Sequence, residues 1–369
     1  MKDLDRYRGC LIGGAAGDAL GYAVEFLDSA SIKQMYGKQG ITEYDLKGGK
    51  ALISDDTQMT LFTANGLLFG TTRGCVRGIM GSYASYIGVC YRDWYRTQRE
   101  SYPLKGEDFH SWLVNVPELF HPRAPGGTCL RAISGETYGT PEEPVNHSKG
   151  CGGVMRVAPI GLYLSADTMP QEQIDRIGAE AAALTHGHPL GYIPAAALVH
   201  IVSLAAHRDD LSLSEIVADM KASIHRQFKG NSYLPAFEQL LDKAVQLSQQ
   251  NLPDEEAIAA LGEGWVAEET LAIAVYCALK YSSDFDKALI ASVNHSGDSD
   301  STGSVTGNIL GAYLGLQAIP AKYTANLELL DVMTELADDL YHDCQINEYT
   351  CSPDGTWEKK YIFCKYTPH

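Results

Sequence analysis

Apolar side chains recur three or four positions apart over much of the chain, which is the spacing of one face of an α-helix. The pattern is clearest in residues 170–184 and 235–249, and it returns between Leu327 and Leu340. Residues 195–206 are almost uniformly apolar, which predicts a buried central helix. Further helices are expected over residues 4–16 (ending at Gly17), 73–95, 212–227, 253–262, 268–292 and 304–316, and one is expected to begin at Cys129.

Three segments depart from this helical pattern. Residues 29–50 and 97–127 are rich in glycine or proline and are expected to be irregular. The tail from Ile346 to Cys364 alternates more like a strand, with Pro353-Asp354-Gly355 as its turn, which predicts a small β-hairpin. Strand signals are nearly absent before residue 345.

The composition is that of an ordinary globular protein, since 45% of the 369 residues are hydrophobic and 20% are charged. This length permits one to three domains. Because no internal repeat, low-complexity tract or linker interrupts the chain, we expect an all-α fold. It would be a single compact multi-helix domain over residues 1–340, followed by the hairpin-like appendage over residues 341–369.

The charge and the cysteines limit the classes of partner and compartment. A formal net charge of −17 makes the chain a poor candidate for binding bare nucleic acid or an anionic membrane. We see no apolar run that approaches about 18 uncharged residues, so no membrane span is expected. The nine cysteines include no CxxC pair. Their odd number, and the lack of signal-peptide features before Asp3-Leu4-Asp5-Arg6, favour a reducing cytoplasm.

Two acidic segments carry the most distinctive chemistry. Asn294 to Gly303 places two aspartates among serines and glycines, and Ser54-Asp55-Asp56-Thr57 offers the same groups far away in sequence. Several oxygens gathered in this way suit a hard cation, which predicts that the two segments meet and hold a pair of metal ions. Helix capping is the competing interpretation, because Asp55 with Gln58 fits a capping box.

Three further features are candidates for binding or catalysis. Glu25 sits among apolar neighbours, which tend to raise a carboxyl pKa, although it could equally be an ordinary, partly exposed residue. Residues 123–128 place bare glycines before a helix, where an anion can bind. The glycine-rich loop 149–156 can present backbone N–H groups to a diphosphate, or it can form a tight turn between helices. Of His186 and His188, we expect one to line a pocket and the other to be structural.

Taken in their order along the chain, these motifs resemble the ADP-ribosylglycohydrolase family. The resemblance spans about residues 6–316. Its segments are Gly9-Cys10-Leu11-Ile12-Gly13 with Gly17-Asp18-Ala19-Leu20-Gly21, Ser54-Asp55-Asp56-Thr57, Arg123-Ala124-Pro125-Gly126-Gly127-Thr128, Gly150-Cys151-Gly152-Gly153-Val154-Met155-Arg156, Thr185-His186, and Gly297-Asp298-Ser299-Asp300-Ser301. Two departures are noted: Ser54 and Ser301 stand where the family often has Thr, and Cys151 stands where many members have Asn or Ser.

The resemblance implies an all-helical fold with a binuclear magnesium centre, in which manganese can substitute. It also implies hydrolysis of the glycosidic bond between ADP-ribose and a target, most often an arginine side chain. The expected partner is therefore an ADP-ribosylated protein or another ADP-ribose conjugate. Carried over by position, the resemblance implies these metal ligands: Ser54, Asp55, Asp56, Asp298, Asp300 and Ser301. Glu25 would be the mobile acid, and His186 would lie near the ribose or a phosphate. The residues expected against the diphosphate are Gly150, Cys151, Gly152, Gly153 and Val154.

On this hypothesis, Glu25, Asp55 and Asp300 are the catalytic residues. Asp300 bridges the two cations, and Glu25 or a ligand carboxylate moves the proton. Three alternatives stay open: a two-metal nucleotide phosphohydrolase, a non-catalytic protein that binds ADP-ribose or metal, and acidic segments that only cap helices. The sequence leaves the target and the oligomeric state undetermined.

Overall fold

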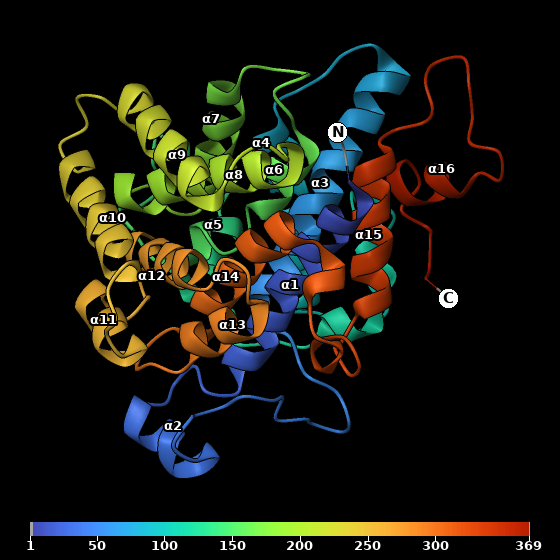
Figure 1. Cartoon of the computed structure of the whole chain (residues 1–369). Helices are drawn as coiled ribbons and strands as arrows, with labels where there is room; N and C mark the ends of the chain where they lie inside the picture. Colours follow the sequence, from blue (N-terminus) through green and yellow to red (C-terminus); the bar gives the residue numbers. More distant parts are fainter. Residues whose placement is uncertain (1–2, 369) are drawn as a thin grey trace.

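Two helices from distant parts of the chain, α1 (Leu4–Tyr22) and α14 (Ser299–Leu314), lie side by side in the interior (Figure 1). The computed structural model describes residues 3–368. Among these residues no β-sheet forms, and backbone pairing outside the helices is limited to isolated bridges. The expected all-α fold is therefore confirmed.

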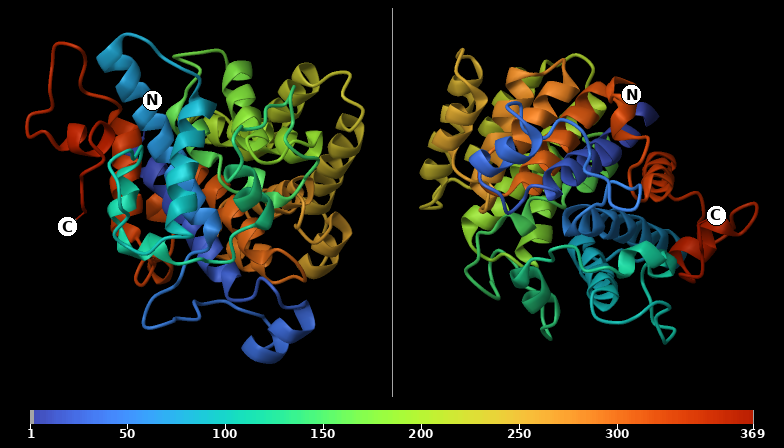
Figure 2. Two further views of the ribbon diagram at one scale, coloured as in Figure 1. Left: turned by 180° about the vertical axis from the view of Figure 1, so that it is seen from behind. Right: turned by 90° about the horizontal axis from the view of Figure 1, so that it is seen from below.

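The other α-helices surround this pair. They are α2 (Ser29–Tyr36), α3 (Asp55–Arg77), α4 (Tyr83–Thr97), α5 (Gly127–Ile133), α6 (Ala158–Tyr163), α7 (Gln171–Ala183), α8 (Pro189–His207), α9 (Leu213–Gln227), α10 (Leu234–Ser248), α11 (Asp254–Leu261), α12 (Ala267–Lys280), α13 (Phe285–Val293), α15 (Leu330–His342) and α16 (Thr356–Tyr361). Short 3₁₀ turns are η1 (Trp112–Asn115), η2 (Pro117–Phe120), η3 (Cys151–Gly153), η4 (Leu316–Ala318) and η5 (Ala321–Tyr323). Figure 2 shows that α16 lies at the edge opposite α10 and α11.

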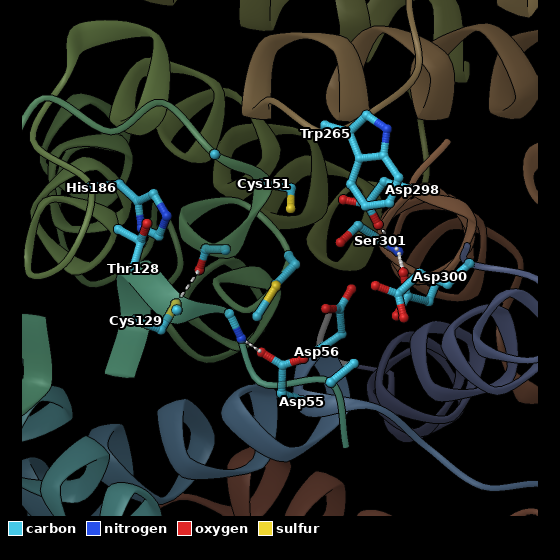
Figure 3. A pocket seen from close by; sticks show the side chains of 17 residues that line it. Asp55, Asp56, Thr128, Cys129, Cys151, His186, Trp265, Asp298, Asp300 and Ser301 are labelled. Atoms are coloured by element: carbon cyan, nitrogen blue, oxygen red, sulfur yellow. Dashed lines mark hydrogen bonds between the residues drawn. The ribbon is translucent and has the colours of Figure 1, made fainter. Parts of the chain in front are cut away.

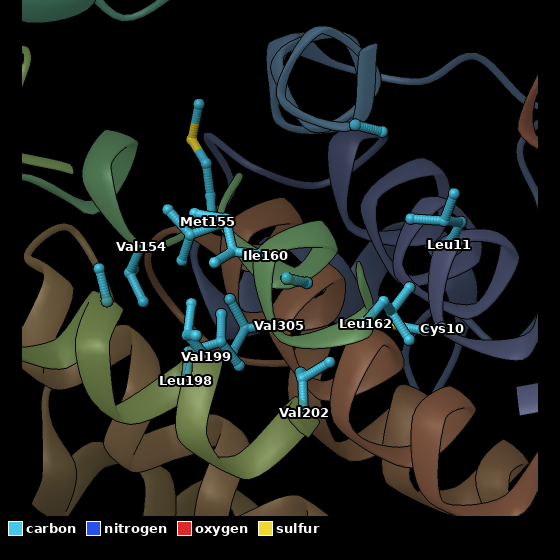
Figure 4. Packing of buried hydrophobic residues seen from close by; sticks show 14 of the residues in the cluster. Cys10, Leu11, Val154, Met155, Ile160, Leu162, Leu198, Val199, Val202 and Val305 are labelled. Atoms are coloured by element: carbon cyan, nitrogen blue, oxygen red, sulfur yellow. The ribbon is translucent and has the colours of Figure 1, made fainter. Parts of the chain in front are cut away.

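Helix α8 is the apolar helix expected at the centre, and it is longer than the sequence pattern indicated. Its 19 residues have a mean hydropathy of 1.6 in the most apolar window, so one described helix is long and apolar enough to span a membrane. That corrects the expectation that no apolar run reaches this length. The window is 94% buried by other helices, and Val199 and Val202 pack near Val305 of α14 (Figure 4). Packing inside the protein therefore accounts for the apolar composition of α8.

The contact between α1 and α14 depends on glycines spaced four residues apart. Gly9, Gly13 and Gly17 of α1 lie against Gly311, Gly307 and Gly303 of α14. A Cβ on Gly13 would lie 2.6 Å from the carbonyl oxygen of Gly307, which is well inside van der Waals contact. The glycines therefore allow the two backbones to approach more closely than any side chain permits.

Gly307→Ala is expected to lower the free energy of unfolding by about 3 kcal/mol, because the new methyl group would overlap the backbone of α1 and force the helices apart. Denaturant unfolding followed by circular dichroism measures the change. Gly74→Ala in α3 is the matched control, since its nearest neighbour is the flexible end of the exposed Met80 side chain. Equal stability of the two variants would contradict the close packing.

Several expected helix boundaries are wrong. Helix α1 continues through Gly17, because this glycine packs against Gly303 and does not end the helix. The single helix expected over 73–95 is two helices, which separate where Gly78 adopts a left-handed conformation with φ 68°. The helix expected over 268–292 is also two helices, and Asp284 caps the second of them through the N–H of Lys287. In the segment expected to be irregular, Asp28 caps α2 through the N–H of Ser31.

The β-hairpin expected in the tail is not formed. Only one isolated bridge joins Asn347 to Thr350, and α16 follows the Pro353-Asp354-Gly355 turn. Trp357 and Tyr361 are four residues apart, so a helix places both on the protein side. The Trp357 Nε1 donates to the Thr72 hydroxyl of α3 over 3.0 Å, and both side chains are buried. The alternation of the tail therefore does not lead to strand pairing here, and a domain boundary at residue 340 stays a prediction.

Candidate functional site

A pocket of about 200 Å³ opens where the N-terminal ends of α3 and α14 meet the glycine-rich loop around η3 (Figure 3). Most of its walls come from segments that are far apart in sequence. The lining residues are Glu25, Asp55, Asp56, Ala124, Gly126, Gly127, Thr128, Cys129, Gly150, Cys151, Gly152, Met155, His186, Trp265, Asp298, Asp300 and Ser301. The two acidic segments therefore meet, as the sequence predicted.

Each acidic segment begins a helix. The Ser54 hydroxyl accepts a hydrogen bond from the Asp56 N–H at 3.1 Å, and the Asp298 carboxylate accepts one from the Ser301 N–H at 3.3 Å. Ser54 and Asp298 therefore cap helices, but the capping box expected from Asp55 with Gln58 is not formed. Asp55 is the first residue of α3, and the Gln58 side chain accepts a hydrogen bond from Trp94 instead. The capping interpretation is thus correct only in part. It does not account for Asp56, whose Oδ2 is buried without a hydrogen-bond partner. The segments contain more carboxylates than capping requires.

The carboxylates are close enough to disfavour one another's charge. Burial, followed by the negative charges of Asp300 and Asp298, raises the pKa of Glu25 to about 10. Burial likewise raises the pKa of Asp55 and Asp56 well above the usual range, and Asp300 is the carboxylate that contributes most to both shifts. A cluster of this kind is unfavourable when fully ionised, and a bound positive charge would relieve it.

Asp18 of α1 supports one wall of the pocket from behind. Its fully buried carboxylate accepts hydrogen bonds from the N–H of Ser54 at 2.9 Å and of Thr57 at 3.1 Å, and from the Thr57 hydroxyl. Burial and the charge of Asp300 raise the pKa of Asp18 to about 7. Asp18 therefore fixes the start of α3 relative to α1 and does not line the pocket.

The donor set fits a hard divalent cation, although the described residues contain no group of three or more His, Cys, Asp or Glu side chains already placed around a metal position. Oxygen atoms predominate, as Mg²⁺ and Mn²⁺ prefer. Two of these atoms, Glu25 Oε2 and Asp56 Oδ2, are buried and lack partners. Coordination would require the carboxylates to turn toward a common point, and the binuclear centre stays a prediction.

Most of the residues proposed from the sequence line this one pocket. Ser54, Gly153 and Val154 do not. Ser54 lies behind the wall, where its side chain hydrogen-bonds the Asp300 carboxylate. The 3₁₀ turn η3 directs Gly153 toward Gly191 of α8 and Val154 into the hydrophobic core (Figure 4).

Other lining residues were missed or left without a role. Trp265 gave no sequence signal, because it reaches the pocket only through the loop between α11 and α12. Thr128 and Cys129 belong to a motif in which only the glycines indicated a binding role. Cys151 lies beside Asp298 and Ser301, and burial raises the pKa of its thiol well above the usual value.

His186 is held in one orientation by a chain of hydrogen bonds. The fully buried Arg156 guanidinium donates to the Thr185 hydroxyl at 2.7 Å, and that hydroxyl lies 2.8 Å from His186 Nδ1. Because the hydroxyl accepts from Arg156, its own proton is free for Nδ1, which leaves the ring proton on Nε2. Nε2 lies beside Gly150 and Gly152 of the lining. His186 can therefore donate a hydrogen bond into the pocket.

The His186 ring is expected to stay neutral from pH 5 to pH 8, because burial and the charge of Arg156 lower its pKa to about 3. In the unfolded chain this ring binds a proton near pH 6.5, whereas in the folded chain it does not. The contribution of the ring to the free energy of unfolding therefore falls as the pH drops from 6.5 toward 3, by about 1.4 kcal/mol per pH unit. NMR of the histidine rings tests this. A His186 titration midpoint between pH 5 and 8 would contradict the assignment.

Comparisons with known proteins show which family the chain resembles along its length. A family model described as ADP-ribosylglycohydrolase matches residues 1–349. A mouse relative named ADP-ribosylhydrolase ARH3 is 25% identical, with 92% of each chain covered. A Rhodospirillum rubrum relative named ADP-ribosyl-[dinitrogen reductase] glycohydrolase is also 25% identical, with 88% of this chain and 91% of that protein covered. A solved structure titled ADP-ribosylglycohydrolase-related protein complex has a TM-score of 0.63 at 24% identity, covering 92% of this chain and 98% of its own, and supports the fold.

Proposed function

Because the chain belongs to the ADP-ribosylglycohydrolase family, whose enzymes hydrolyse glycosidic bonds of ADP-ribose, we propose that it removes ADP-ribose from arginine side chains of proteins with the help of two divalent cations. The observation that carries the metal-dependent part is the convergence of five carboxylates on one pocket. These are Glu25, Asp55, Asp56, Asp298 and Asp300. Their mutual repulsion supports a site that binds positive charge.

The residues that would hold the cations are Asp55, Asp56, Asp298, Asp300 and Ser301. When bound, the cations supply positive charge that orients the hydroxyls of the reacting ribose and makes a water molecule a better nucleophile. Asp300 has the central place among these ligands. It is the carboxylate that most strongly raises the pKa of Asp18, Glu25, Asp55, Asp56 and Asp298.

The other end of the pocket suits the diphosphate. Gly127 and Gly152 bring bare backbone to the wall, where N–H groups can bind an anion, and His186 can donate from Nε2. The N–H groups of Gly126 and Gly150 already donate to Asp55 and Ser148. The pocket alone is small for ADP-ribose. A second hollow of about 450 Å³ shares Thr128 with it. We therefore place the adenosine beyond Thr128 and the reacting ribose at the carboxylates.

The hydrolysis itself breaks one bond and requires protons to be transferred as it breaks. A water oxygen forms a bond to the anomeric carbon as the carbon–nitrogen bond to the guanidine breaks. Glu25 lines the pocket with an unpartnered Oε2, so it can accept the proton of the water or return one to the leaving nitrogen. The negative carboxylates also stabilise positive charge that develops on the ribose in the transition state.

The test of this function is release of free ADP-ribose from an ADP-ribosyl-arginine peptide by the purified protein in the presence of Mg²⁺. Chromatography of the nucleotide products distinguishes the alternatives. ADP-ribose supports the proposal, whereas AMP or phosphate would identify a nucleotide phosphohydrolase. Binding of ADP-ribose without any release from arginine-, serine- or base-linked conjugates would identify a non-catalytic binding protein.

A further inference from the structure

Two aromatic rings stand at the mouth of the pocket and remain accessible to solvent. Phe26 directly follows Glu25, and Trp265 is one of the lining residues. Their rings stack with centroids 6.1 Å apart and planes inclined by 20°. The exposed fractions are 73% for Phe26 and 39% for Trp265, which is unusual for large apolar residues that already have a stacking partner.

The backbone around Trp265 is fixed to the site on two sides. Its carbonyl accepts a hydrogen bond from the Cys151 N–H at 3.2 Å, and the Glu263 carbonyl of the same loop accepts one from the Asp298 N–H at 2.8 Å. Gly264 adopts φ 83°, a conformation that glycine favours, and the Thr270 hydroxyl donates to its carbonyl. The loop thus holds the indole beside both the glycine loop and the acidic segment.

On the substrate orientation proposed above, the aromatic pair lies on the side of the pocket from which the leaving group would depart. Trp265 stands beside Asp298 and Ser301, and His186 and Thr128 lie at the other end (Figure 3). With the diphosphate toward His186 and the reacting ribose at the carboxylates, the group attached to the anomeric carbon points away from His186. It therefore reaches the segment that carries Glu25 and Phe26.

We propose that the stacked pair Phe26–Trp265 is the binding site for the leaving group and selects a planar cation, the guanidinium of a modified arginine. This inference rests on the proposed function. An aromatic face attracts a cation through its quadrupole, and a guanidinium also stacks on it as a plane. The neutral hydroxyl of a serine leaving group gains neither interaction.

The separation of the rings indicates how the cation would bind. A third plane inserted between two rings requires about 7 Å, twice the ordinary stacking distance of about 3.5 Å. The observed 6.1 Å is smaller, so the guanidinium is expected on an exposed face of the pair and not between the rings. Trp265 is the main platform, because its backbone is held by the hydrogen bonds described above.

The test compares kcat/KM for arginine-linked and serine-linked ADP-ribose peptides in wild type, Trp265→Ala and Trp265→Phe. We expect Trp265→Ala to lower kcat/KM on the arginine conjugate about 10-fold more than on the serine conjugate, mainly through KM, and Trp265→Phe to restore most of the difference. Tyr349→Ala is the matched control, since Tyr349 is an exposed aromatic residue in a turn that does not line the pocket. Equal losses on the two conjugates would overturn the inference.

A binding measurement separates this inference from the proposed function. With Mg²⁺ and ADP-ribose present, methylguanidinium is expected to quench tryptophan fluorescence in wild type and not in Trp265→Phe, whereas methanol at the same concentration has no effect. If wild type releases no ADP-ribose from either conjugate, the proposed function fails and the quenching still decides the inference. Identical quenching in both proteins would overturn the inference even if hydrolysis is observed.

Discussion

Asp300→Asn is expected to reduce turnover by at least about 10³-fold, which corresponds to about 4 kcal/mol in the activation barrier. The substitution preserves the size of the side chain and removes the charge at the centre of the carboxylate cluster. Without cations, the variant is expected to be at least as stable as wild type, because Asp300 raises the pKa of every neighbouring carboxylate. A loss of activity together with unchanged or increased stability separates a functional role from a structural one.

Steady-state kinetics and thermal unfolding of the same preparation measure both effects. Asp93→Asn is the matched control. Asp93 is also buried, its pKa is raised to about 7 by burial, and it does not line the pocket. Asparagine can keep the hydrogen bonds that Asp93 accepts from the N–H groups of His110 and Ser111, so activity should persist. Near-native turnover of Asp300→Asn would refute the two-cation proposal.

Removal of divalent cations is expected to abolish hydrolysis and to lower the melting temperature. A ligand present at 100 times its Kd stabilises the native state by about 2.7 kcal/mol, which for a chain of this length is a shift of about 3–5 °C. The reason is that bound cations relieve the repulsion among Asp55, Asp56, Asp298 and Asp300. Dialysis against EDTA followed by calorimetry and an activity assay measures both changes.

Re-addition of cations provides the control for this experiment. Mg²⁺ or Mn²⁺ should restore activity and melting temperature together in wild type. In Asp300→Asn the stabilisation by either ion should be much smaller, because the central ligand has lost its charge. Equal turnover in EDTA and in Mg²⁺ would exclude a metal-dependent reaction, and the carboxylates would then have to act alone.

The meeting of Asp55 and Asp56 with Asp298 and Asp300 could be predicted from sequence, because both acidic segments carry the same unusual density of oxygen atoms. The long amphipathic helices could be predicted for the same kind of reason, since each has a regular apolar face. By contrast, the sequence does not indicate that Gly150 and Gly152 face the pocket while Gly153 and Val154 of the same loop do not. Only the turn of η3 shows which of them face the pocket.

Features that depend on long-range contacts could not be predicted from local patterns. Gly17 reads as the end of a helix until Gly303 is seen to lie against it. The tail reads as a hairpin until Trp357 is seen to contact α3. Trp265 reaches the pocket because its loop bonds to Cys151, more than 100 residues earlier in the chain. Each of these errors arose where tertiary structure decides between two locally acceptable conformations.

The glycine contact between α1 and α14 also sets the time at which the site can form during synthesis. Glu25 follows directly on the first helix of the chain, whereas Asp298 and Asp300 begin a helix near residue 300. At about 5–20 residues per second, a ribosome needs about 14–55 s between these two segments. Until α14 emerges, the glycine face of α1 has no partner and the carboxylates are not gathered. A nascent chain shorter than about 314 residues would therefore lack the pocket, so a prematurely terminated product could neither bind nor cleave substrate there.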